Sequence, residues 1–273
     1  MKLLSWNVAG KLRRLDEQAD LVLRAEADVV CLQEVRATSA PRWTARLQEA
    51  GWPHTAVARP RAQPVASRPL SVLIAAREAL EQTEVPDLPW PERVLAVRTG
   101  GLEVVGVHSP ISPSPGLAKV LTHEALHRYL SSGSGPRIVC GDLNTPRREH
   151  PDGRVWTFAR DRYGRLRPER GERWDQAELA LIRGLEPAGF RDAFREMHGL
   201  ARRELSWEWP QWGGGYRLDH LIVSREVNVH AVTYLHEWRK VGLSDHSPLF
   251  AVLSWPAAAS QPGKRRRSSA QHP

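Results

Sequence analysis

Hydrophobic and polar residues follow strand and helix periods along the first half of the chain. Apolar, β-branched runs at residues 2–8, 27–35 and 69–77 predict buried strands. Apolar residues recur at helical spacing over 13–26, which predicts an amphipathic helix between the first two strands. Residues 41–50 predict a second, shorter helix. The first half therefore consists of strand–helix units.

Further strands come in sequential pairs. Two apolar runs at 93–99 and 102–109 are separated by Gly100-Gly101, a strong β-hairpin signal. The remaining predicted elements are a helix at 117–131, a strand at 137–141, a helix at about 175–186, and strands near 216–223, 229–235 and 247–254. Hairpins combined with strand–helix–strand units predict an α/β fold of two packed sheets with helices outside.

Composition is typical of a globular protein, with 41% hydrophobic and 26% charged residues in 273. We expect one domain over residues 1–255 and a disordered basic tail over 256–273, which is polar and contains Pro and Ser. No apolar run approaches the ~20 residues of a membrane span, so no membrane partner is expected. Cys31 and Cys140 lie in strand-like runs and predict buried free thiols in a reducing, cytoplasmic compartment. A disulfide between them stays open as the alternative, because pairing depends on geometry.

The net charge of +8 is concentrated in two segments. The Arg-rich insert (residues 147–173) holds nine Arg against five acidic residues, and the tail holds four basic residues and no acid. The rest of the chain carries 26 basic and 26 acidic residues. Basic clusters favour polyanions, nucleic acid first, whereas the alternative is a solvated surface loop. With a polynucleotide substrate, we expect the insert to follow backbone phosphates through Arg160, Arg162, Arg165 and Arg167.

Polar groups stand at or near the ends of six predicted strands. Each one alone is explained equally well by a turn, a cap or a solvent-facing side chain. Six together predict a site, because functional side chains gather on the loops at one end of a sheet. The positions are Asn7, Glu34, His108, Asp142 with Asn144, Asp219 with His220, and Asp245 with His246.

The residue types at these ends suit a divalent metal ion and phosphate chemistry. Glu34 and Asp245 offer hard oxygen ligands for Mg²⁺, and Asn7 adds a neutral one. No Cys/His cluster with zinc spacing is present in the sequence. The other groups provide a base, a hydrogen-bond donor to phosphate and an imidazole oriented by a carboxylate. These are Asp142, Asn144, and His246 with Asp219.

Short motifs in the chain carry a family resemblance. "SWNV", "LQEV", "VHSP", "GDLN", "SW" followed by "RLDHLIVS", and "LSDHSPL" occur in that order over about residues 2–254. In this the chain resembles the endonuclease/exonuclease/phosphatase superfamily, which includes exonuclease III-type apurinic endonucleases and deoxyribonuclease I. The resemblance implies a four-layer α/β sandwich, with two packed mixed β-sheets flanked by helices.

The resemblance also implies roles for the strand-end residues. Glu34 would be the main Mg²⁺ ligand, with Asn7 and Asp245 near it and Mn²⁺ as a possible substitute. His108 stands where apurinic endonucleases usually have Tyr, and is similar to the imidazole that helps the leaving oxygen in the deoxyribonuclease I and phosphoesterase branches. The remaining implied roles are the water-orienting base for Asp142, the phosphate ligand for Asn144, and transition-state stabilisation for His246 paired with Asp219.

The leading hypothesis is a Mg²⁺-dependent phosphodiesterase, a nuclease that hydrolyses DNA or another nucleic acid as a monomer. Arg217 is a candidate substrate-binding residue, and Trp209 and Trp212 could form an aromatic platform for bases or pack the sandwich edge instead. Two alternatives remain. One is a phosphatase or phospholipase-type hydrolase of small phosphate esters, and the other is a non-catalytic nucleic-acid-binding module, which the complete set of site residues disfavours.

Overall fold

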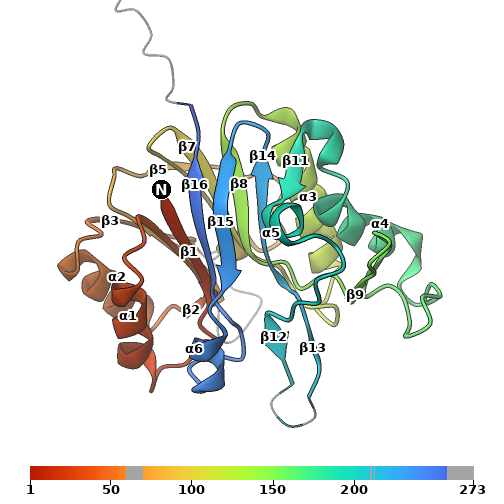
Figure 1. Cartoon of the computed structure of the whole chain (residues 1–273), viewed down its shortest axis with the longest axis horizontal. Coiled ribbons are helices and arrows are strands. Elements are labelled where there is room, and N and C mark those ends of the chain that lie inside the picture. Colours follow the sequence, from red (N-terminus) through yellow and green to blue (C-terminus); the bar gives the residue numbers. More distant parts are fainter. Residues whose placement is uncertain (60–69, 210, 212, 257–273) are drawn as a thin grey trace, which may run out of the picture.

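Two six-stranded β-sheets pack face to face, and helices cover both outer faces (Figure 1). The computed structural model describes residues 1–59, 70–209, 211 and 213–256. The predicted four-layer α/β sandwich is confirmed. The predicted disorder of the tail concerns residues that lie, apart from Pro256, outside the described part of the chain.

The first sheet has the strand order β15-β16-β1-β2-β4-β3. β1 and β2 run parallel, as a strand–helix–strand unit requires, and the other neighbours are antiparallel. Its strands are β1 (Lys2–Asn7), β2 (Val29–Arg36), β3 (His54–Val57), β4 (Leu70–Ala76), β15 (Asn228–Tyr234) and β16 (Leu249–Ser254).

The second sheet has the order β11-β14-β8-β7-β6-β5 and repeats this plan, with β7 and β8 as its parallel pair. Its strands are β5 (Glu81–Thr83), β6 (Val94–Thr99), β7 (Leu102–His108), β8 (Arg137–Asp142), β11 (Phe190–Asp192) and β14 (Asp219–Ser224). Two short hairpins stand apart from the sheets: β9 (Arg148–Glu149) with β10 (Val155–Trp156), and β12 (Trp207–Glu208) with β13 (Gly215–Tyr216).

The longer helices, α1 to α4, pack on the outer faces of the sheets, whereas α5 contributes Phe194 to the core between them. The first sheet buries its outer apolar face against α1 and α2, and the second buries its own against α3 and α4. The helices are α1 (Leu15–Arg24), α2 (Ala40–Glu49), α3 (Ala118–Ser132), α4 (Gly171–Ile182), α5 (Ala193–His198) and α6 (His236–Lys240), with short 3₁₀ turns at Pro91–Arg93 and Glu186–Ala188. Among the described residues, no helix is both long and apolar enough to span a membrane.

The central core lies between the two sheets and contains both cysteines. Cys31 and Cys140 are buried free thiols, as the sequence predicted, and no disulfide joins them. Hydrogen bonding with Cys140 and burial raise the pKa of the Cys31 thiol well above its usual value. The sheets approach so closely here that a Cβ at Gly106 would lie 2.5 Å from Cys31 Sγ. This close contact fixes one sheet against the other.

Some predicted elements differ from the structure. The helix expected at 175–186 begins and ends earlier, at Gly171 and Ile182. The strand expected at 216–223 is divided: β13 pairs with β12 in the separate hairpin, and β14 enters the second sheet at Asp219, with Arg217 and Leu218 between them. The sequence pattern missed β3, β5, β11, α5 and α6. These elements have only three to six residues, too few to show a hydrophobic period.

Candidate active site

The polar strand ends meet at one edge of the sandwich. Parallel neighbours place their carboxyl ends at the same edge, so Asn7 of β1 lies beside the end of β2 and His108 of β7 beside Asp142 of β8. Antiparallel β14 starts at this edge, with Asp219 directly opposite Asp142. Two sheets thus supply one cluster, as the sequence pattern predicted.

Asn7 connects the two sheets within this cluster. Its fully buried Nδ2 donates to Glu34 Oε1 at 3.1 Å and to Asp142 Oδ2 at 3.0 Å. Its Oδ1 accepts the backbone N–H of Ala9 at 2.9 Å. In this geometry Asn7 orients two carboxylates, and its predicted role as a metal ligand stays a prediction.

Asp142 lies at the centre of the cluster and is 2% exposed. Burial raises the pKa of Asp142 to about 7. The His246 cation opposes this rise, and the carboxylates of Asp219 and Glu34 add to it. The Asn144 backbone N–H donates to Asp142 Oδ1 at 2.8 Å. A buried carboxylate beside two others favours a proton or a cation in its vicinity.

Asp219 and His246 form the predicted pair. His246 Nδ1 donates to Asp219 Oδ2 at 2.8 Å, and His246 Nε2 lies 3.8 Å from Asp142 Oδ2. Burial alone would lower the pKa of His246, but the carboxylates of Asp219 and Asp142 raise it to about 10. His246 is therefore an imidazolium at neutral pH and can donate a hydrogen bond to an anionic oxygen.

Glu34 and His108 form the more accessible side of the cluster. A β-bulge in β2 gives Glu34 a φ of 58°, uncommon for a residue other than glycine, and leaves its side chain 24% exposed. His108 Nε2 lies 3.4 Å from Glu34 Oε1. Burial and the cations of Arg93 and His246 lower the pKa of His108 well below its usual value. His108 is therefore a neutral imidazole.

Arg93 is a site residue that sequence reasoning missed. It ends the 3₁₀ turn before β6, and its guanidinium donates from Nη1 to His108 Nδ1. Burial lowers the pKa of Arg93, and the carboxylates of Glu34, Glu92 and Asp142 oppose that change. The available signal was an arginine directly before the buried run "VLAV", at the start of the strand that pairs with β7.

Asn144 lies in the loop after β8, in the left-handed region with a φ of 50°. Its Nδ2 donates to the Ser109 carbonyl at 2.8 Å and to Asp142 Oδ2 at 3.3 Å. Buried Lys119 donates to the Asn144 carbonyl at 2.7 Å. These contacts fix the loop, and the predicted contact of Asn144 with phosphate stays a prediction.

Among the described residues, two groups of side chains have ligand atoms close enough to hold a metal ion. One is Glu34, His108 and Asp142, and the other is Asp142, Asp219 and His246, with all atoms of a group within 4.8 Å of one another. A protonated His246 has no free lone pair, so the first group is the better site. Its two carboxylates are hard oxygen ligands, and they fit a small divalent cation.

Asp245 belongs to neither of the two groups found among the described residues. Its Oδ2 accepts the indole N–H of Trp207 at 3.0 Å, and its Oδ1 lies 3.5 Å from Ser244 Oγ. The predicted ligand therefore lies beside the cluster and links it to the β12–β13 hairpin. Its role as a metal ligand stays a prediction.

The predicted substrate-binding residues lie in different surroundings. Arg217 is 3% exposed, and its guanidinium donates to Glu149 and Asp192, which indicates a structural role. Trp209 is 42% exposed on the β12–β13 hairpin and packs edge-on against Trp207 at 4.5 Å between ring centroids. Trp212 lies outside the described residues.

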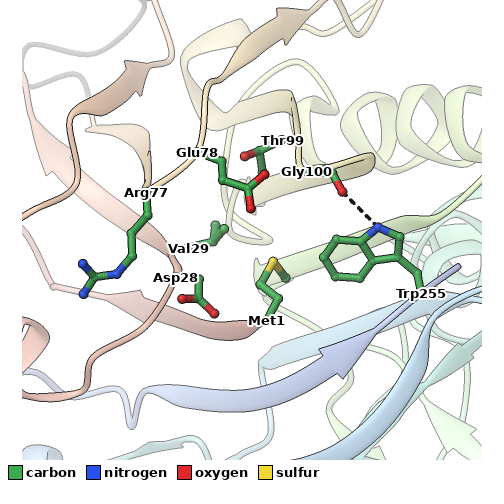
Figure 2. Close-up of a pocket in the computed structure, with 8 residues that line it drawn as sticks. All are labelled: Met1, Asp28, Val29, Arg77, Glu78, Thr99, Gly100 and Trp255. Atoms are coloured by element: carbon green, nitrogen blue, oxygen red, sulfur yellow. Dashed lines mark hydrogen bonds between the residues drawn. The ribbon is translucent and has the colours of Figure 1, made fainter. Parts of the chain in front are cut away.

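A separate cavity of about 300 Å³ lies at the opposite end of the sandwich. Figure 2 shows Glu78 and Trp255 on its walls, together with Met1 and Val29 from the starts of β1 and β2. Trp255 Nε1 donates to the Gly100 carbonyl at 3.0 Å. Strand starts are a full strand length away from Asn7 and Glu34, so this cavity takes no part in the acidic cluster.

Two mixed sheets with carboxylates and imidazoles at one common edge define an enzyme that hydrolyses phosphoric esters. The chain matches the Endonuclease/Exonuclease/phosphatase family over residues 4–246 and belongs to it. The resemblance inferred from the motifs and the predicted enzyme class are thereby confirmed.

Several solved structures share the fold of this chain. An AP endonuclease from Archaeoglobus fulgidus is 21% identical, with a TM-score of 0.71 over 92% of this chain and 98% of that one. The 3′ phosphatase NExo from Neisseria, bound to a product DNA hairpin, is 22% identical, with a TM-score of 0.66 over 93% and 100%. The NExo 3′-5′ exonuclease from Neisseria meningitidis is 23% identical, with a TM-score of 0.64 over 93% and 100%. No curated protein matches this chain.

Proposed function

We propose that the chain is a Mg²⁺-dependent phosphodiesterase that acts as a nuclease on DNA. The observation that carries the proposal is the buried cluster in which Asn7 orients Glu34 and Asp142 beside the His246–Asp219 pair. When bound, Mg²⁺, or Mn²⁺ in its place, would neutralise charge on the phosphoryl oxygens. We assign its binding mainly to Glu34, because this carboxylate is the accessible one.

Asp142 would be the base that orients and deprotonates the attacking water. Its pKa of about 7 suits general base catalysis near neutral pH, and the Asn144 backbone N–H holds the carboxylate in place. His246 would donate from Nε2 to a non-bridging phosphoryl oxygen, while Asp219 keeps the ring oriented and charged. Neutral His108 would support the leaving oxygen from the Glu34 side.

Two observations favour DNA as the substrate. Two proteins with the same fold are an AP endonuclease and a 3′ phosphatase bound to a product DNA hairpin. Exposed Trp209 lies on the hairpin that carries Trp207, and Trp207 donates to Asp245 beside the cluster. An aromatic surface next to the reaction centre suits base stacking. We also propose, as the sequence predicted, a cytoplasmic location and a monomer.

A substrate panel tests the proposal. Purified protein would be incubated with Mg²⁺ and plasmid DNA, an abasic duplex, a single-stranded oligonucleotide, a 3′-phosphorylated duplex, and nucleotide or phosphoinositide esters. We expect cleavage of at least one DNA substrate, its loss in EDTA, and a loss of several orders of magnitude in Glu34→Gln. Turnover of small esters alone would favour the phosphatase alternative, and activity that persists in EDTA would refute the metal assignment.

A further inference from the structure

A basic groove lies beside the loop that follows β8, close in sequence to residues of the acidic cluster. Its volume is about 520 Å³. Its lining includes Pro146 and Arg147, two and three residues after Asn144, and Arg217, two residues before Asp219. The segment of residues 200–205 forms the other wall and leads to the β12–β13 hairpin. The groove is therefore continuous in the chain with both sides of the proposed reaction centre.

Most charges at the base of this groove are already paired. Glu149 accepts from both Arg195 and Arg217, at distances of 2.7–2.9 Å. Glu204 contacts His236 Nε2 at 3.0 Å, and the guanidinium of Arg202 is 3.9 Å away. The groove thus has no acidic side chain left to balance further cations in its lining.

Three guanidinium groups of the lining remain uncompensated. Arg147 and Arg203 make no side-chain hydrogen bond, ion pair or ring contact within the described part of the chain. Arg148 only packs over the Trp156 ring, with its guanidinium carbon 5.5 Å from the ring centroid. Arg148 and Arg203 are exposed, and Arg147 is half-buried. Unpaired arginines that converge on one groove are a binding surface for phosphate groups.

Of the four arginines expected to follow a polynucleotide, Arg160 and Arg167 already have acidic neighbours, and Arg162 and Arg165 lie outside the lining of the groove. Arg160 forms a bidentate ion pair with Asp175, and Arg167 lies 4.0 Å from Glu169. Arg162 and Arg165 are exposed and pack over the Tyr163 ring. The exposure of Arg162 and Arg165 therefore fits the alternative interpretation of the Arg-rich insert, that it is a solvated surface loop.

We propose that Arg147, Arg148 and Arg203 bind the sugar–phosphate backbone of a polynucleotide that extends from the active site into this groove. The inference rests on the proposed nuclease function and names the surface that would separate a polynucleotide from a small phosphate ester. Arginine forks match phosphate oxygens, and contacts with the backbone do not depend on base sequence. The groove therefore contributes affinity and register without selecting a sequence.

The decisive measurement is the salt dependence of binding to a fluorescein-labelled DNA duplex, in an Asp142→Asn background that does not cleave it. The double variant Arg147→Gln/Arg203→Gln is compared with the charge-matched control Arg162→Gln/Arg165→Gln. Each phosphate contact changes the slope of log affinity against log salt by about 0.9. We expect the groove variant to lose roughly two units of slope and the control to keep the slope of the parent.

An unchanged slope in the groove variant, or equal losses in both variants, would overturn the proposal. Arg148→Gln/Arg203→Gln serves as a second groove pair if Arg147→Gln lowers the melting temperature. The proposed nuclease function is tested separately, by DNA cleavage with Asp142 intact. If the parent protein cleaves DNA but the groove variant keeps its salt slope, only the proposed role of the groove is refuted. If the groove variant loses slope but the parent protein cleaves no DNA, only the proposed nuclease activity is refuted.

Discussion

At the scale of single residues, neighbouring charges give the two histidines of the cluster opposite states. His246 lies beside Asp219 and Asp142, which raise its pKa to about 10 in spite of burial. His108 lies beside Arg93, and burial together with this cation lowers its pKa well below the usual value. One buried site thus holds a charged hydrogen-bond donor, His246, and a neutral imidazole, His108, which can play different roles in phosphoryl chemistry.

The charged state of His246 predicts a non-additive mutational cycle. Asp219→Asn removes the carboxylate that orients and charges the ring, and His246→Ala removes the ring itself. We expect each variant to lose roughly 10²–10⁴-fold in kcat/KM. The double variant should lose little more, because the two residues act as one unit. Steady-state kinetics on the cleaved DNA substrate would measure the four proteins.

The alternative for this pair is a purely structural role. It predicts a large loss of melting temperature in both single variants and losses of activity that follow the unfolded fraction. Fully additive kinetic losses, in variants that melt like the parent, would show that Asp219 does not act through His246.

At the scale of elements, a buried ion pair joins α3 and α4 to the loop after β8. Lys119 of α3 donates to Glu178 Oε1 of α4 at 2.7 Å, and both residues are at most 1% exposed. Glu178 also accepts the Thr145 hydroxyl at 2.6 Å and the Phe158 backbone N–H at 2.9 Å. One carboxylate therefore holds two helices, the catalytic loop and the Arg-rich insert together.

Removal of the lysine charge should destabilise this junction strongly. Lys119→Met keeps the length of the side chain but leaves Glu178 as a buried charge without its cation. We expect a loss of about 3–5 kcal/mol in the free energy of unfolding. The double variant Lys119→Met/Glu178→Gln should recover part of the lost stability, because the buried side chain at position 178 is then neutral. Urea unfolding measures both values, and a loss below about 1 kcal/mol in Lys119→Met would contradict this account.

A second buried network ties the short strands together. Arg217, which precedes β14, donates to Glu149 of β9 and Asp192 of β11. Burial alone would raise the pKa of Glu149, but Arg217 and Arg195 lower it to about 2, below the usual 4.5. At Asp192, too, burial alone would raise the pKa, but Arg217 and His220 lower it. A carboxyl group with a lowered pKa stabilises the fold above its usual pKa and loses this contribution in acid.

The variant Arg217→Met should therefore show a pH-dependent loss of stability. At pH 7 both carboxylates are charged and lack their main cation, so we expect a loss of about 3–5 kcal/mol. Below about pH 5 the wild-type protein gradually loses the contribution of this network, and the variant has less to lose. The difference between the two unfolding free energies should shrink from pH 5 towards pH 2. If the difference in unfolding free energy between the wild-type protein and Arg217→Met did not change with pH, the ion pairs of Arg217 would contribute nothing to stability.

At the scale of the whole molecule, sequence patterns predicted what depends on long regular elements. Apolar strands and amphipathic helices define the two sheets and the outer layers, and polar ends of parallel strands define a common edge. Arg93 was missed because its role depends on the pairing of β6 with β7, which brings its turn to His108. The buried contacts of Arg217 could not be predicted, because its partners, Glu149 and Asp192, come from strands of two and three residues with no detectable period, and its role as a substrate ligand stays a prediction.

The position of the acidic cluster between the two sheets predicts that a metal ion stabilises the entire fold. Glu34 comes from the first sheet and Asp142 from the second, so an ion held by both would join the two halves of the sandwich. An ion that binds only the native state adds RT ln(1 + [L]/Kd), about 2.7 kcal/mol at 100 times Kd. Thermal melts in EDTA and in Mg²⁺ measure this effect. We expect the melting temperature of the wild-type protein to rise with Mg²⁺ and that of Glu34→Gln to change little.

The matched control is Glu78→Gln, which removes the same charge from the exposed wall of the opposite cavity and should keep the full rise in melting temperature. A rise that survives in Glu34→Gln would place the ion elsewhere, whereas its loss in Glu78→Gln would show a general effect of charge.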